Sequence, residues 1–207
     1  MRFLENYCRL DFESDADFRE NYKVTAPEKF NYGFDVVDVL AEKDPDKTAL
    51  VWCNDKGEER FFTFKEISEL SAKAANAFAK LGVKRGDKVL LILKRRYQFW
   101  YSIVGLHKLG ATAIPATNLL TSKDIAYRID AAGVKMVLCT GVDGDDDEVV
   151  THVAEGVMKS QRPDEVIKGC VRGQREGFVD FDALVEEASP VFDREDWDAN
   201  YDPELIS

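Results

Sequence analysis

Three short apolar runs with helical patterns between them constrain the fold of this chain most strongly. The first run, Val89–Leu93, is continuously apolar, which is typical of a strand buried on both faces of a sheet. Comparable runs start near residues 112 and 136, and the segments between the runs carry apolar residues at helical spacing. This alternation predicts an α/β fold: a layered, mainly parallel sheet with right-handed crossovers and helices on both faces.

The ends of the helices can also be located in the sequence. Thr63 and Glu66 have the spacing of a capping box, in which two side chains satisfy backbone N–H groups at the start of a helix. Thr121 is placed to begin a later helix, and Gly110 and Gly133 follow the last apolar residues of two helices. Glycine is favoured there because the residue after a helix commonly adopts a left-handed backbone.

Two further elements precede the predicted sheet. Residues 1–32 hold aromatic residues among Asp, Glu and Asn without a period, and we interpret them as an N-terminal arm whose aromatic side chains hold it to a body. Runs at 49–53 and 60–64 flank the turn Asn54–Gly57 and predict a β-hairpin. We therefore divide the chain into an arm over 1–32 and one α/β unit over 33–207.

Acidic residues gather after the last of the three strands, in Gly141–Glu148. Hard cations bind several oxygens, but this segment lacks the alternating acids and the distant Glu of an EF-hand. We interpret it as a solvated loop and the first turn of a helix that ends near Ser160, because acids stabilise the positive end of a helix dipole. A strand within 165–171 and a short helix from Phe181, ended by Pro190, complete the expected elements.

The net charge and the absence of long apolar runs narrow the class of partner and the location. A formal charge of -11 repels nucleic-acid phosphates and anionic membranes, so neither is expected as a partner. No apolar run approaches the roughly 20 residues that span a bilayer. The N-terminus has no apolar core like that of a signal peptide, so we expect a cytoplasmic protein.

Cysteine and histidine are sparse, which limits the possible chemistry. The cysteines form no CxxC pair and are expected to be reduced thiols; they are Cys8, Cys53, Cys139 and Cys170. His107 and His152 are the only histidines, and we interpret both as structural or surface residues. The sequence therefore predicts no metal centre, and no catalytic Ser–His–Asp or Cys–His group.

A search for phosphate-binding loops finds neither GxxxxGK[ST] nor GxGxxG. Gly82–Lys88 lies between a helix end and a buried strand, so we interpret it as a connecting turn. Lys94–Arg96 instead follows a buried strand, on the side where open α/β sheets bind ligands. An anion site is one interpretation of Lys94–Arg96, and a solvated basic turn that pairs with nearby acids is the favoured one. Residues that bind a cofactor are left unassigned.

Four segments, taken in order, resemble landmarks of the AMP-forming acyl-CoA synthetases, a family of adenylate-forming enzymes. They are Phe62–Ile67, Gly82–Val89, Leu106–Pro115 and Asn118–Ile129. The last of them is similar to the medium-chain acyl-CoA synthetase branch. The resemblance covers roughly residues 30–140 and implies that this α/β unit is part of an acetyl-CoA synthetase-like large domain.

The resemblance also implies a reaction. In that family a carboxylate and ATP form an acyl-adenylate and pyrophosphate, and CoA then displaces AMP; magnesium and cationic groups spread the phosphate charge. The family's phosphate-binding loop normally follows a segment like Asp202–Ser207. We therefore expect an N-terminal portion that ends before this loop, carries no catalytic residue of the family and is inactive alone. ATP, magnesium and CoA are expected to serve the full-length enzyme.

Two other classes of protein stay open on sequence grounds. The chain could be a free-standing, non-catalytic α/β binding or interaction module, which a natural stop codon after Ser207 would favour. It could also be an unrelated nucleotide-binding domain, although we expect weak or no binding of ATP, AMP and CoA by this chain. An N-terminal portion could leave an apolar face or a sheet edge uncovered, so self-association is expected.

Overall fold

A computed structural model describes residues 3–141 and 147–194, and the chain divides into two compact units, Met1–Phe30 and Asn31–Ser207. The first unit contains η1 (Phe3–Asn6) and α1 (Asp15–Asn21). Arg9 forms an ion pair with Asp17 at 2.9 Å, and a bridge between strand-like residues joins Cys8 to Val24. The division into an arm over 1–32 and a body over 33–207 stays a prediction.

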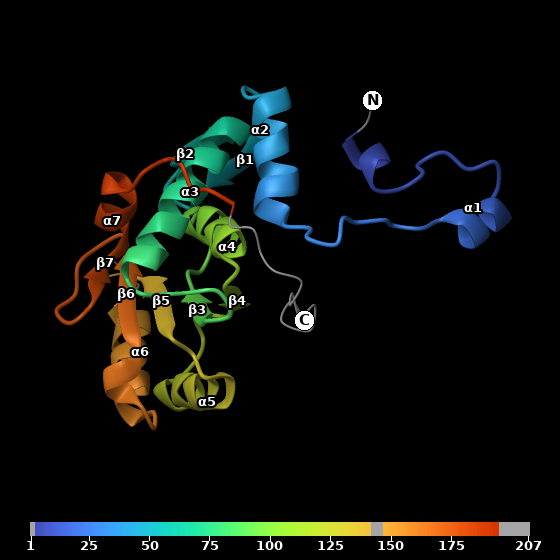
Figure 1. Cartoon of the computed structure of the whole chain (residues 1–207). Helices are drawn as coiled ribbons and strands as arrows, with labels where there is room; N and C mark the ends of the chain where they lie inside the picture. Colours follow the sequence, from blue (N-terminus) through green and yellow to red (C-terminus); the bar gives the residue numbers. More distant parts are fainter. Residues whose placement is uncertain (1–2, 142–146, 195–207) are drawn as a thin grey trace. The chain divides into compact units, whose positions relative to one another are not determined.

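The second unit is built on a five-stranded sheet, as the apolar runs predict (Figure 1). Its strands are β3 (Lys88–Ile92), β4 (Thr112–Pro115), β5 (Met136–Thr140), β6 (Ile167–Val171) and β7 (Val179–Asp180). They lie in the order β4-β3-β5-β6-β7, and each neighbouring pair is parallel. The mainly parallel α/β fold class is therefore confirmed, and β4 lies at an edge, where a strand that ends in proline is tolerated.

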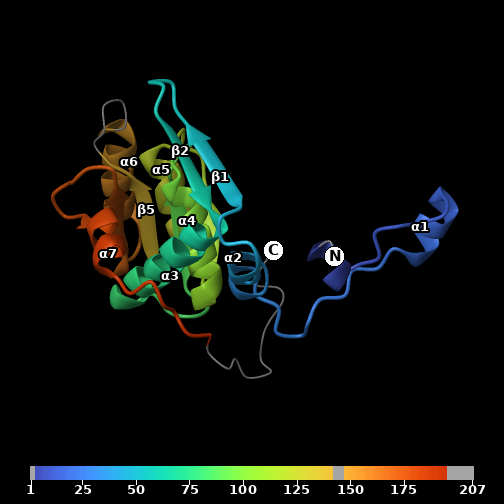
Figure 2. The same ribbon diagram turned by 90° about the horizontal axis from the view of Figure 1, so that it is seen from above.

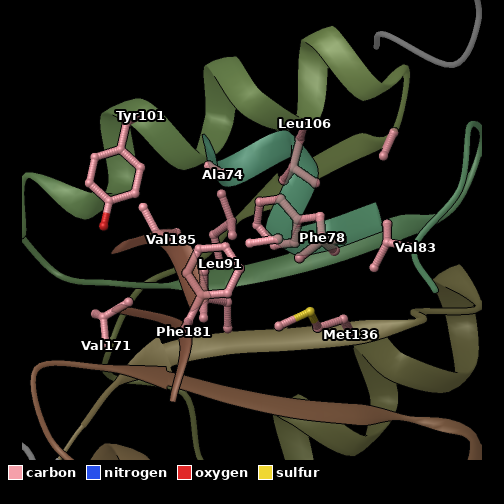
Figure 3. Packing of buried hydrophobic residues seen from close by; sticks show 14 of the residues in the cluster. Ala74, Phe78, Val83, Leu91, Tyr101, Leu106, Met136, Val171, Phe181 and Val185 are labelled. Carbon is pink, nitrogen blue, oxygen red and sulfur yellow. The ribbon is translucent and has the colours of Figure 1, made fainter. Parts of the chain in front are cut away.

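Helices cover both faces of this sheet. They are α3 (Phe64–Lys80), α4 (Gln98–Leu109), α5 (Ser122–Ala132), α6 (Asp147–Lys159) and α7 (Phe181–Glu187). On one face α3, α4 and α7 bury a core in which Phe78 and Phe181 lie with ring centroids 4.5 Å apart (Figure 3). On the other face α5 and α6 pack on the alternate residues of the strands, such as Leu90 and Val137. Each central strand is thus buried on both sides, which explains its continuous apolar sequence.

The predicted hairpin forms a separate two-stranded antiparallel sheet of β1 (Thr48–Cys53) and β2 (Glu59–Thr63). It follows the π-helix η2 (Gly33–Asp38) and α2 (Val39–Lys43), and it lies alongside α3 and α4 (Figure 2). Phe62 packs with Val37, Ile67 and Val104 in a third apolar cluster. Phe64, which was predicted to end the second strand, is instead the first residue of α3 because Thr63 caps that helix.

The predicted helix ends are confirmed in detail. Thr63 and Glu66 form both hydrogen bonds of a capping box, and Thr121 forms the same arrangement with Asp124. Gly110 and Gly133 follow α4 and α5 with φ values of 73° and 66°, in the left-handed region that favours glycine.

Other expectations need correction. The helical spacing of apolar residues predicts that Trp100 of α4 is buried, but its side chain is 50% exposed. The strand expected from residue 165 begins at Ile167 after a short 3-10 turn, η3 (Pro163–Glu165), and the two-residue strand β7 was not foreseen. The acids Asp143, Asp145 and Asp146 lie outside the described residues. Within the described part of the chain, no helix is long and apolar enough to cross a membrane.

Candidate functional site

A hollow of about 610 Å³ lies between the hairpin and the carboxyl ends of β3 and β4. Three short segments line it: the end of β1 with its turn, the turn after β3, and the turn after β4. The lining residues are Trp52, Cys53, Asn54, Asp55, Lys94, Arg95, Arg96, Ala116, Thr117 and Asn118. Its volume and its place beyond parallel strand ends are those of a small-molecule site.

The turn after β3, Lys94–Arg96, gives the hollow its charge. Lys94, Arg95 and Arg96 line the hollow, and Asp55 is the acidic residue among the lining residues that the structure describes, in a chain whose overall charge is -11. Lys94 and Arg95 are exposed, whereas Arg96 is half-buried and directs its Nε toward Thr140 Oγ1 at 3.4 Å. The structure therefore places the basic turn predicted from sequence in the lining of this hollow, at the carboxyl edge of the sheet.

The backbone of this turn is held from two sides. The Arg96 N–H donates to the Leu93 carbonyl at 3.0 Å, and Lys94 has a left-handed backbone with φ of 50°. Trp52 of the hairpin donates its Nε1–H to the Arg95 carbonyl at 2.6 Å. Trp52 is 7% exposed, and its ring lies edge-on to that of Tyr97 with centroids 5.3 Å apart.

Sequence reasoning missed the part that the hairpin plays in this site. Trp52 and Thr117 carry no motif, Asn118 is only the first residue of a family-like segment, and the sequence indicated β1 only as half of a hairpin. A usable signal was the alternation of the hairpin strands, which turns Trp52 and Phe62 inward, toward whatever the hairpin covers.

A polar network lies near the carboxyl end of β6, among residues that do not line the hollow. Asp182 accepts hydrogen bonds from Gln98 Nε2 and Tyr101 Oη, each at 3.3 Å, and from the Arg172 backbone N–H at 2.6 Å. Burial, reinforced by the Asp182 charge, holds the pKa of Tyr101 well above its usual value. Tyr101 therefore stays a neutral donor, and the network ties α4, α7 and the end of β6 together.

Lys108 of α4 is a buried cation in one of the family-like segments. Its Nζ lies 2.8 Å from Asp38 Oδ1, and it also donates to the Ser68 carbonyl at 3.2 Å. Burial lowers the pKa of Lys108, while the hydrogen bond to Asp38 opposes that shift. The contacts give this lysine a structural role, that of joining η2, α3 and α4.

The histidines lie apart from the hollow. His107 is half-buried on α4, and burial lowers its pKa. His152 lies beside Glu148 on α6, at 4.0 Å. Over residues 3–141 and 147–194, no three His, Cys, Asp or Glu side chains are grouped to hold a metal ion. None of the four cysteines, all of which the structure describes, forms a disulfide, and two of them, Cys139 and Cys170, are buried.

Comparison with known proteins gives these features a family context. A family model described as "AMP-binding enzyme" matches residues 37–205, which is most of the chain. The chain belongs to this family. The resemblance to the N-terminal portion of acyl-CoA synthetases is thereby confirmed, and curated relatives support it further.

The acyl-coenzyme A synthetase ACSM1 of Homo sapiens is 34% identical over 190 residues, and the match covers 88% of this chain but 31% of that protein. ACSM4 of Rattus norvegicus is 35% identical over 170 residues, with 79% of this chain and 28% of the relative covered. The chain thus spans about a third of the length of these AMP-binding relatives. Both relatives are named as mitochondrial, which contradicts the cytoplasmic location expected from the sequence.

Solved structures support the fold assignment. A benzoate CoA ligase from Burkholderia xenovorans LB400 superposes with a TM-score of 0.65 at 21% identity, covering 82% of this chain and 31% of that protein. An acyl-CoA synthetase from Brucella canis gives 0.64 at 21% identity, covering 80% and 29%. At this level of identity the likeness shows that this member of the AMP-binding family shares their fold.

Proposed function

We propose that this chain is the N-terminal part of an AMP-forming acyl-CoA synthetase, which joins a carboxylate to CoA and converts ATP to AMP and pyrophosphate. Membership of the AMP-binding family over residues 37–205 is the observation that carries the proposal. The ordered landmarks from Phe62 to Ile129 support it, since they form the helix caps and turns that shape the sheet. The acyl substrate is left open.

The hollow beside the hairpin contributes to this reaction by receiving phosphate groups of CoA or ATP. Lys94, Arg95 and Arg96 supply positive charge at the carboxyl edge of the sheet, where the substrates of such folds bind. Cationic groups positioned in advance offset the charge on phosphates during acyl and phosphoryl transfer. Magnesium is proposed for the whole enzyme, but no described residue of this chain is assigned to it.

The 207-residue chain is proposed to be catalytically inactive by itself. Among its described residues no three His, Cys, Asp or Glu side chains are grouped to hold a metal ion, and neither histidine lines the hollow. The test is carboxylate-dependent exchange between ATP and labelled pyrophosphate, measured for this chain and for a longer form of the protein. Exchange only in the longer form is expected, whereas robust exchange by this chain alone would refute its inactivity.

A free-standing binding module is the second candidate, and one observation favours it. The α/β unit has apolar cores on both faces of its own sheet, so it has the packing of a self-sufficient domain. Sequencing the gene beyond Ser207 separates the two candidates. A reading frame that continues supports the synthetase, and a natural stop codon supports the module.

A further inference from the structure

A side chain of the hairpin, that of Trp52, donates a hydrogen bond to the cationic turn of the hollow. We propose that Trp52 is the positioning residue of this anion site: its indole N–H fixes the Arg95 carbonyl and thereby sets where the cations of Lys94–Arg96 stand. This inference rests on the proposed role of the hollow in binding phosphate groups. It adds a function for the hairpin, of which only Phe62 and Thr63 belong to a family-like segment.

The contact joins two parts of the fold that are otherwise independent sheets. Trp52 lies in β1, which pairs only with β2 among the described strands, whereas the turn follows β3 of the five-stranded sheet. The two partners are 43 positions apart in the chain. The 2.6 Å hydrogen bond from Trp52 therefore links the position of the hairpin to that of the basic turn.

The backbone of the turn has an unfavourable conformation that an external hydrogen bond can stabilise. Lys94 has a left-handed backbone, with φ of 50°, which residues other than glycine adopt rarely and at some energetic cost. A strained turn relaxes unless its surroundings hold it, and the bond to Arg95 acts one residue beyond the strain. Once that bond is lost, the backbone from which the three cationic side chains extend has more freedom, so an anion must order it on binding.

The indole itself is held firmly, which is a condition for positioning something else. Its ring meets that of Tyr97 edge-on, and the Arg172 guanidinium lies 6.0 Å from its centroid on the strand-β6 side. Arg172 is in turn fixed by its backbone N–H, which donates to Asp182. Trp52 is therefore supported independently of any ligand in the hollow.

Phe62 of the same hairpin provides a matched control. It is 7% exposed, as Trp52 is, and its ring centroid lies 5.2 Å from that of Tyr97, against 5.3 Å for Trp52. Phe62 has no polar atom and does not line the hollow. A change at Phe62 thus disturbs the packing of the hairpin without removing a hydrogen bond to the basic turn.

The test is a titration of the 207-residue chain with inorganic pyrophosphate and with CoA at low salt, followed by the backbone amide signals of an NMR spectrum. The variants are Trp52→Phe, Phe62→Leu, and a form with benzothienylalanine at position 52. That analogue keeps the shape of tryptophan and replaces the N–H with sulfur. It is introduced in a Trp100→Phe/Trp197→Phe background, since these are the other tryptophans.

In the parent chain, pyrophosphate is expected to shift the amides of residues 94–96 and 117–118. Both changes at position 52 are expected to weaken binding about fivefold, the factor that corresponds to one ordinary hydrogen bond. Phe62→Leu is expected to leave affinity within twofold while lowering stability. The analogue keeps the test valid if Trp52→Phe fails to fold.

Two results would overturn the positioning role of Trp52, and a third would overturn the anion site on which that role rests. Unchanged affinity in the benzothienylalanine form would show that the N–H does not position the turn. An equal loss in Phe62→Leu would reduce the effect to general packing. If pyrophosphate and CoA leave the amides of 94–96 unshifted in the parent chain, the hollow itself is not an anion site, and that part of the proposed function fails.

Discussion

The buried pair of Lys108 and Asp38 offers a sharp test of how η2, α3 and α4 are joined. Asp38→Ala removes the carboxylate that lies 2.8 Å from the Lys108 ammonium, which is 2% exposed. It also removes the acceptor of the Ser68 hydroxyl at 2.6 Å. The ammonium would then be buried with the Ser68 carbonyl as its remaining described acceptor, at 3.2 Å.

Removing one partner of a buried ion pair typically costs about 3–5 kcal/mol. The Asp38 side chain keeps 25% of its surface exposed, so water partly replaces it and the lower end, about 3 kcal/mol, is expected. Most small domains have a total stability of about 5–15 kcal/mol, so this loss is large. Urea unfolding followed by circular dichroism measures it as a fall in the midpoint with an unchanged slope.

Two controls separate the buried pair from ordinary surface charge. Glu155→Ala breaks the exposed pair with Lys159, and it is expected to cost less than about 0.5 kcal/mol. Asp38→Ala/Lys108→Met removes both charges and is expected to recover part of the loss, because no unpaired ammonium remains. If Asp38→Ala is no more destabilising than Glu155→Ala, the structural role given to Lys108 is wrong.

The pair also has a predictable dependence on pH. Burial lowers the pKa of Lys108 below its ordinary value of 10.5, so the unfolded chain binds more protons between the folded pKa and that value. Stability from this group therefore rises with pH through that window. Asp38→Ala removes the carboxylate that opposes the lowering of the Lys108 pKa, so the pH range over which stability rises extends further toward low pH. If the loss in free energy of unfolding caused by Asp38→Ala increased with rising pH, the predicted direction of this pH dependence would be wrong.

Three further outcomes are expected. Gly105→Ala should lower the free energy of unfolding in urea by about 1–3 kcal/mol despite a better helix propensity, because the new Cβ would lie 2.8 Å from the Ser71 carbonyl oxygen. A gain of about 1 kcal/mol, as for an exposed Gly-to-Ala change, would refute this packing argument. Lys94→Glu should weaken pyrophosphate binding more than Lys123→Glu does, because Lys123 lies outside the hollow, and this difference should shrink as the salt concentration rises. Equal effects of the two substitutions would argue against a localised site. Phe61→Ser should reduce self-association measured by light scattering, because Phe61 and its strand partner Val51 are 63% and 55% exposed on the hairpin. A parent chain that stays monomeric at high concentration would contradict this expectation.

Much of the fold could be predicted because its signals are local. Val89–Leu93 is apolar on both faces, and Thr63 and Gly110 act on the backbone within one helical turn. Trp100 is exposed although it follows the apolar spacing of α4, because helical spacing identifies a shared face without saying which neighbour covers it. β7 was missed because two residues are too short to show a period.

The site was predictable only in part, for a different reason. Lys94–Arg96 is contiguous and follows a strand, so the order of elements alone placed it at the carboxyl edge. Trp52 reaches the same place through pairing of β1 with β2 and packing of the hairpin, a tertiary contact that no window of sequence contains. The location of the protein was inferred from the lack of an apolar N-terminal segment, an argument that the names of the relatives contradict.

The order of the strands does not by itself account for the hollow. The chain leaves β3 for β4 on one side and later returns to place β5 on the other, with α4 and α5 on opposite faces of the sheet. Connections that depart in opposite directions leave a gap between β3 and β5, whatever side chains are present. The hollow lies instead on the β4 side of β3, between the hairpin and the ends of β3 and β4. Its described walls are turns, so substitutions at residues 94–96 and 117–118 are expected to change selectivity for ligands while the two apolar cores beneath them stay unchanged.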